Sequence, residues 1–72
     1  MSWREVVKVL DRLGYRLVRQ KGSHMLFKKD GNLVVVPKHK EIRPGTLLNI
    51  IDQIGLTKQE FIKLLRTRLH KK

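Results

Sequence analysis

The chain has 72 residues and contains no cysteine. This absence excludes a disulfide framework, a thiolate nucleophile and a cysteine-based zinc site. The first residues, Met1–Glu5, contain no apolar signal region, and no hydrophobic run approaches the ~20 residues that a membrane span requires. We therefore expect a cytoplasmic protein.

Acidic residues are also scarce: six Asp and Glu stand against 17 Lys and Arg, which gives a formal charge of +11. Glu5 and Glu60 fit helix caps and the other four are scattered, so no carboxylate cluster for Mg²⁺ is predicted. His24, His39 and His70 share no metal-ligand spacing. We expect no metal or other cofactor, and a polyanionic partner, first of all nucleic acid.

The first part of the chain predicts one amphipathic helix. Ser2 and Glu5 form a capping box, which satisfies unpaired backbone N–H groups at the start of the helix. Apolar residues then recur at helical spacing as far as Leu13, with charged residues on the opposite face. Gly14 is a suitable C-terminal stop.

A three-stranded antiparallel meander is predicted next. Its strands cover residues 15–20, 24–29 and 32–36. The pair Asp30 and Gly31 favours a two-residue type I′ hairpin turn, and Pro37 ends the third strand. With this register, His24 and Phe27 fall on opposite faces. We expect the helices to cover the Phe27 face and the His24 face to stay open.

The last part of the chain predicts two helices. Pro44 suits the first turn of a strongly apolar helix that ends at Gly55, and Thr57 with Glu60 forms a second capping box. The expected fold is α+β, in the order α-β-β-β-α, with the helices on one face of the sheet and a short C-terminal helix. Residues 1–72 would form one domain, with its core in residues 2–61 and a frayed basic tail at 66–72.

Residues 47–64 also allow a different interpretation, a helix-turn-helix that binds DNA. Gly55 would begin its turn, and Lys58 and Gln59 would open the recognition helix. Against this, Ile51 stands where a close helix crossing generally needs a small residue. A DNA binder of this type and a non-catalytic RNA-binding domain remain the alternatives to an enzyme.

His24 is the candidate for catalysis, because it would lie on the open face directly after a turn. An imidazole there could act on RNA as a general base or acid, for example by taking the proton of a 2′-hydroxyl that attacks the neighbouring phosphate. Lys21, Lys28 and the backbone amides of Gly22 and Ser23 could stabilise the charge on that phosphate. The alternative is that His24 only caps the turn.

The loop between the sheet and the second helix supplies further positive charge. Lys38, His39 and Lys40 are expected to contact RNA phosphate, with His39 as a contact rather than a proton-transfer group. Ser23 is not predicted to be a nucleophile, because no Ser-His-acid set accompanies it.

The segment Gly22-Ser23-His24-Met25-Leu26-Phe27 resembles the signature of the HicA toxin family, in which Gly-Ser-His is followed shortly by an aromatic residue. The resemblance extends from about Ser2 to Phe61. Within it the matching segments are Gly14-Tyr15, Val18-Arg19, Val34 to Pro37, Pro44-Gly45-Thr46-Leu47 and Gly55-Leu56-Thr57.

This resemblance implies a double-stranded-RNA-binding-like fold and the toxin of a type II toxin–antitoxin system. Such a toxin is a metal-independent mRNA interferase, an endoribonuclease that cuts mRNA and is neutralised by a HicB-type antitoxin. The family's catalytic histidine maps onto His24, and the Gly-Ser before it onto Gly22 and Ser23. We expect single-stranded mRNA and the antitoxin as partners, with a toxin–antitoxin heterotetramer as one assembly.

Overall fold

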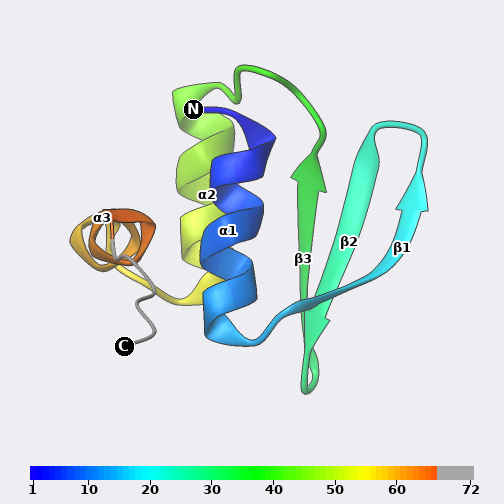
Figure 1. Ribbon diagram of the computed structural model, residues 1–72, viewed down its shortest axis with the longest axis horizontal. Coiled ribbons are helices and arrows are strands. Elements are labelled where there is room, and N and C mark those ends of the chain that lie inside the picture. The colour runs from blue at the N-terminus through cyan, green and yellow to red at the C-terminus, as the bar shows by residue number, and fades with distance from the viewer. Residues whose placement is uncertain (67–72) are drawn as a thin grey trace, which may run out of the picture.

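The computed structural model describes residues 1–66 of the chain (Figure 1). Its elements are α1 (Trp3–Leu13), β1 (Arg16–Lys21), β2 (His24–Lys29), β3 (Asn32–Pro37), α2 (Pro44–Ile54) and α3 (Lys58–Arg66). This order confirms the predicted α+β fold, α-β-β-β-α with a further short helix. The predictions for His70 and for the tail after Arg66 fall outside the described residues.

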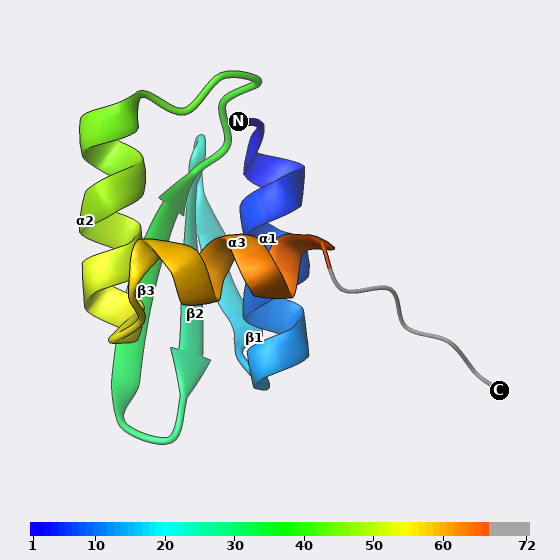
Figure 2. The same ribbon diagram turned by 90° about the vertical axis from the view of Figure 1, so that its left-hand side faces the viewer.

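The three strands form one antiparallel sheet in the order β1-β2-β3. Helices α1 and α2 lie on one face of this sheet, and α3 crosses them on the side away from the strands (Figures 1 and 2). No helix within residues 1–66 lies on the opposite face of the sheet (Figure 1). Among the described residues, no helix is long and apolar enough to cross a membrane.

The core lies between this sheet face and the helices. The sheet contributes two buried residues from β2, Met25 and Phe27, and two from β3, Val34 and Val36. The helices contribute Val6, Val9, Leu10, Ile50, Ile51 and Phe61, and two connecting segments add Tyr15 and Ile42. The expectation that the Phe27 face is the covered one is therefore confirmed.

The turn between β2 and β3 has the predicted length but not the predicted type. Lys29 pairs with Asn32, so Asp30 and Gly31 form a two-residue loop. A type I′ turn needs positive φ at both central residues. Only Asp30 has it, at 54°, so the type I′ prediction is wrong and the pattern is that of type II′. The register depends on the loop length, and it is unaffected.

Both capping boxes are present. The Ser2 amide donates to Oε1 of Glu5 at 2.9 Å. At α3 the Thr57 amide donates to Oε1 of Glu60 at 2.8 Å, and the Glu60 amide donates to the Thr57 hydroxyl at 3.1 Å. These bonds satisfy N–H groups that have no partner within the first helical turn, so each helix begins where the sequence predicts.

A substitution of Phe61 tests how much the stability of the fold depends on α3. Its ring is fully buried, and removing a buried aromatic ring costs about 3–5 kcal/mol. We expect Phe61→Ala to lower the free energy of unfolding by that amount in urea denaturation. The adjacent Ile62 is 42% exposed, so Ile62→Ala is the control and should cost less than about 1 kcal/mol. Equal losses in the two variants would contradict this packing.

Candidate nucleic-acid interface and active site

The uncovered side of the sheet, here called the open face, is basic and partly apolar. The strand registers place nine side chains on it: Arg16, Arg19, Lys21, His24, Leu26, Lys28, Leu33, Val35 and Pro37. Leu33 and Val35 are 51% and 43% exposed. Exposed apolar residues in a contiguous group commonly mark a surface that a partner covers.

A β-bulge at Val18 decides which basic side chains of β1 reach the open face. The pairing register of β1 shifts by one residue between Leu17 and Arg19. Because side chains alternate along a strand, the extra residue moves every later side chain to the other face. Arg19 and Lys21 thereby join the open face, where Lys21 lies directly opposite His24.

His24 is exposed at the first position of β2, after the two-residue turn of Gly22 and Ser23. Gly22 has φ of 58°, a left-handed conformation that glycine adopts without a steric penalty, and an added Cβ there would meet only open space. The backbone conformation at position 22, rather than a lack of space for a side chain, therefore explains why glycine stands there. The turn leaves the imidazole at the end of the sheet, where a long polymer can reach it.

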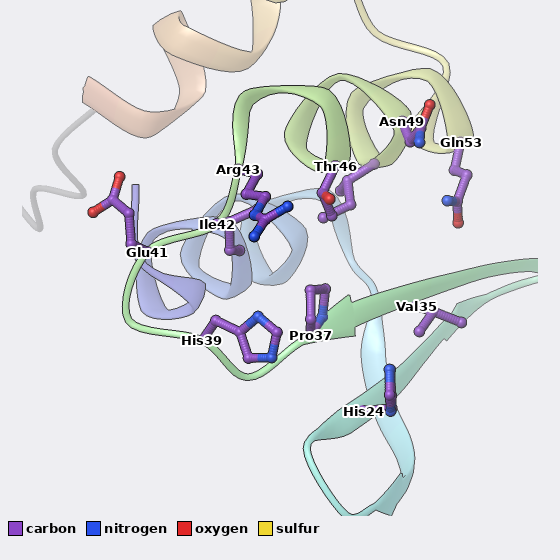
Figure 3. Close-up of a pocket in the computed structure, with 11 residues that line it drawn as sticks. His24, Val35, Pro37, His39, Glu41, Ile42, Arg43, Thr46, Asn49 and Gln53 are labelled. Atoms are coloured by element: carbon purple, nitrogen blue, oxygen red, sulfur yellow. The ribbon is translucent and has the colours of Figure 1, made fainter.

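A cleft of about 640 Å³ runs between this end of the open face and α2 (Figure 3). Its lining contains His24, Val35, Pro37, His39, Glu41, Ile42, Arg43, Thr46, Asn49, Ile50 and Gln53. The histidines come from two different segments, and Figure 3 draws them on either side of Pro37. The structure thus brings together two imidazoles that lie 15 positions apart in the sequence.

Four backbone hydrogen bonds fix the loop that carries His39. The Lys38 amide donates to the Ser23 carbonyl at 2.6 Å and the His39 amide to the Pro37 carbonyl at 2.9 Å. The amino-terminal segment holds the other side of the loop, because Trp3 N–H donates to the His39 carbonyl at 3.1 Å. Ile42 N–H donates to the Met1 carbonyl at 2.7 Å. His39 is therefore exposed but set on a constrained backbone.

The predicted lysines do not all lie at this site. Lys28 shares a face with His24 but is four residues further along β2, roughly 13 Å away. Lys38 turns back toward α1, with its Nζ 5.2 Å from the centre of the Trp3 ring, a cation–π contact. Lys40 is exposed and does not line the cleft. Of the predicted lysines, Lys21 lies closest to His24 in the sheet pairing.

Four residues that the sequence analysis did not single out line the cleft from the α2 side: Arg43, Thr46, Asn49 and Gln53. The last three recur at helical spacing, so they form one polar stripe on an otherwise apolar helix. This polar pattern at helical spacing is the sequence signal from which these three residues could have been predicted. Arg43 precedes the first turn of α2, which contains no acidic side chain, so this end of the cleft is positive.

Among the described residues that line the cleft, Glu41 carries the one carboxylate, and it has an ion-pair partner. Oε2 of Glu41 accepts a hydrogen bond from the Met1 amino group at 2.6 Å. Figure 3 draws the Glu41 side chain pointing away from the His24 end of the cleft. Within residues 1–66, no three His, Asp or Glu side chains gather in a group that could hold a metal ion.

The proposed recognition helix of the helix-turn-helix interpretation is α3, and it packs across α1. Phe61 is buried beneath it. Arg12 of α1 donates to the Leu64 carbonyl, and its Nη1 lies 3.5 Å from the Leu65 carbonyl oxygen. These contacts satisfy C-terminal carbonyls of α3, so the helix completes the core. They favour this structural role over insertion into a DNA groove.

Fold and site together define a small basic α+β domain with a double-stranded-RNA-binding-like element order and a histidine-lined surface cleft. A family model described as the HicA toxin of bacterial toxin–antitoxin systems matches residues 3–56. The chain belongs to the HicA toxin family, and this makes it the toxin of a toxin–antitoxin pair, with an antitoxin as its partner. A comparison with curated proteins finds no match.

The amino-terminal support of the His39 loop leads to a test by hydrogen exchange. Removing Met1 deletes the carbonyl that accepts the Ile42 N–H. Because one such bond contributes about 0.5–1.5 kcal/mol, we expect the Ile42 amide to exchange about two- to tenfold faster. The Lys38 amide, bonded to Ser23 within the sheet, is the internal control and should keep its rate. An unchanged Ile42 rate would show that the amino terminus does not hold this loop.

Proposed function

We propose that the protein is a metal-independent endoribonuclease that cuts single-stranded mRNA, with His24 as its catalytic residue. The single observation that carries the proposal is the position of His24: an exposed imidazole at the mouth of a cleft, on a basic face that none of the described helices covers. Membership of a toxin family explains why such an activity would need a dedicated inhibitor.

The chemistry assigned to His24 is general base catalysis. Its neutral imidazole takes the proton of the 2′-hydroxyl, and the 2′-oxygen attacks the adjacent phosphorus. Imidazole suits this step because it exchanges protons near neutral pH. The nucleophile belongs to the RNA itself, so the reaction requires neither an activated protein side chain nor a metal-bound water.

Charge on the phosphate is stabilised by groups on both sides of His24. Lys21 lies opposite it in the sheet, and the amides of Gly22 and Ser23 lie in the turn before it. Arg43 approaches from the α2 side of the cleft. An arginine can bond two phosphate oxygens at once, and it is the cation that the sequence analysis omitted. Lys28, Lys38 and Lys40 remain proposed phosphate contacts further out, and His39 is a proposed phosphate contact within the cleft.

The open face offers a single-stranded RNA both charge and apolar area. Arg16, Arg19 and Lys28 can follow the phosphates, and binding through them weakens as salt rises. Leu33 and Val35 are exposed between them and can contact the sugars and bases. The same surface is suited to a HicB-type antitoxin, whose acidic and apolar groups would compete with RNA. A toxin–antitoxin heterotetramer is the assembly we propose for the neutralised form.

His24→Ala tests this function. We expect RNA cleavage and growth arrest to be lost, because the base is removed, while the fold is kept, because the side chain is exposed. Cleavage of a labelled RNA, growth of the expressing cells and the urea denaturation midpoint are the three measurements. Wild-type cleavage should survive EDTA, and co-expression of the antitoxin should restore growth.

Phe61→Ala serves as the comparison for this experiment, since it should lower stability without touching the cleft. Cleavage retained by His24→Ala would overturn the catalytic assignment. Wild-type protein that binds the RNA without cutting it would instead indicate a non-catalytic RNA-binding domain.

A further inference from the structure

We infer that His39 is the second proton-transfer residue of the cleft, the general acid that protonates the departing 5′-oxygen of the RNA. This inference rests on the proposed function, because it completes the reaction that His24 begins. It revises the expectation from the sequence, in which His39 only contacts phosphate. The observation behind it is that both histidines line one cleft, on either side of Pro37 (Figure 3).

The reaction itself requires two proton transfers. As the 2′-oxygen bonds to phosphorus, its proton passes to His24. The bond from phosphorus to the 5′-oxygen breaks, and the imidazolium of His39 gives its proton to that oxygen. The products are a 2′,3′-cyclic phosphate and a 5′-hydroxyl. One proton is taken up and one is released, so no water, metal or further reactant enters this step.

In-line displacement places the attacking and departing oxygens on opposite sides of phosphorus. The base and the acid must therefore approach the phosphate from two directions. His24 comes from the first residue of β2, and His39 comes from the loop after β3. Because both line the same cleft, a phosphate bound between them can meet one imidazole at each oxygen.

No other cleft residue within the described part of the chain can serve as the acid. Val35, Pro37, Ile42 and Ile50 are apolar, and Thr46, Asn49 and Gln53 carry neutral groups that do not titrate near neutral pH. Arg43 carries a guanidinium, which is not among the side chains that act as general acids. Glu41 is an ion-pair partner of the Met1 amino group. By chemistry and by position, His39 is the remaining candidate.

The backbone around His39 is suited to such a role. Its own N–H and carbonyl are both engaged, with Pro37 and Trp3 respectively. The Lys38 amide next to it is bonded to Ser23, the residue that directly precedes His24. The two histidines are thus tied through one short backbone connection, and a general acid must be held within hydrogen-bond reach of the atom it protonates. Substituting the His39 side chain leaves these bonds in place.

Two RNA oligonucleotides that differ in one atom test the inference. Both carry a site that the wild-type protein cuts, one with the natural 5′-oxygen and one with sulfur in its place. A thiolate leaves without prior protonation, so the sulfur substrate does not need a general acid. On the oxygen substrate we expect His39→Ala to lose about 10²–10⁴-fold in rate. On the sulfur substrate it should come within about tenfold of wild type.

Three further variants make the outcome decisive. His24→Ala should be inactive on both substrates, because each needs the base. Lys21→Ala removes the nearest competing proton donor and should lose rate equally on both. Lys8→Ala, an exposed cation on α1, controls for charge and should match wild type. Equal loss on both substrates by His39→Ala, or sulfur rescue of Lys21→Ala instead, would overturn the role of His39. Activity in His24→Ala would overturn the proposed function itself.

Discussion

The packing of all the described helices on one side of a three-stranded sheet is the constraint on which the rest of this structure depends. Met25, Phe27, Val34 and Val36 are buried on that side, and strand alternation then fixes what the other side presents. Within residues 1–66, no other helix or strand covers the open face. Its exposed apolar and basic groups are therefore available to a partner, and in our proposal RNA and the antitoxin compete for this one surface.

The register of the hairpin connects this core to the catalytic proposal. His24 pairs with Pro37 at the end of the β2–β3 ladder. Proline has no N–H to donate, and the next hydrogen bond is made by Lys38 to the Ser23 carbonyl. This bond holds the start of the loop against the end of β2, and His39, the next residue, lies in the cleft that His24 lines. The same strand pairing that stabilises the sheet thus sets the position of both imidazoles.

The sequence was informative at most places where local chemistry decides structure, although the type of the Asp30–Gly31 turn was predicted wrongly. The capping boxes, the two-residue turn and the face that holds Phe27 were predicted, because each depends on neighbouring residues or simple alternation. The bulge at Val18 was not predicted, since nothing local marks it, and it places Arg19 on the open face. The sequence also did not predict that Arg43 lies in the same cleft as the two histidines, because this depends on how α2 packs along the edge of β3.

The central claim is that the RNA's own 2′-hydroxyl cuts the chain with the help of imidazole. The chemistry of the new ends tests this most directly, by mass spectrometry of the fragments from one oligonucleotide of known sequence. The claim predicts a 2′,3′-cyclic phosphate, or the 3′-phosphate formed from it, on the upstream fragment and a 5′-hydroxyl on the downstream fragment. A 3′-hydroxyl and a 5′-phosphate would contradict it, because those ends require attack by water from outside the RNA.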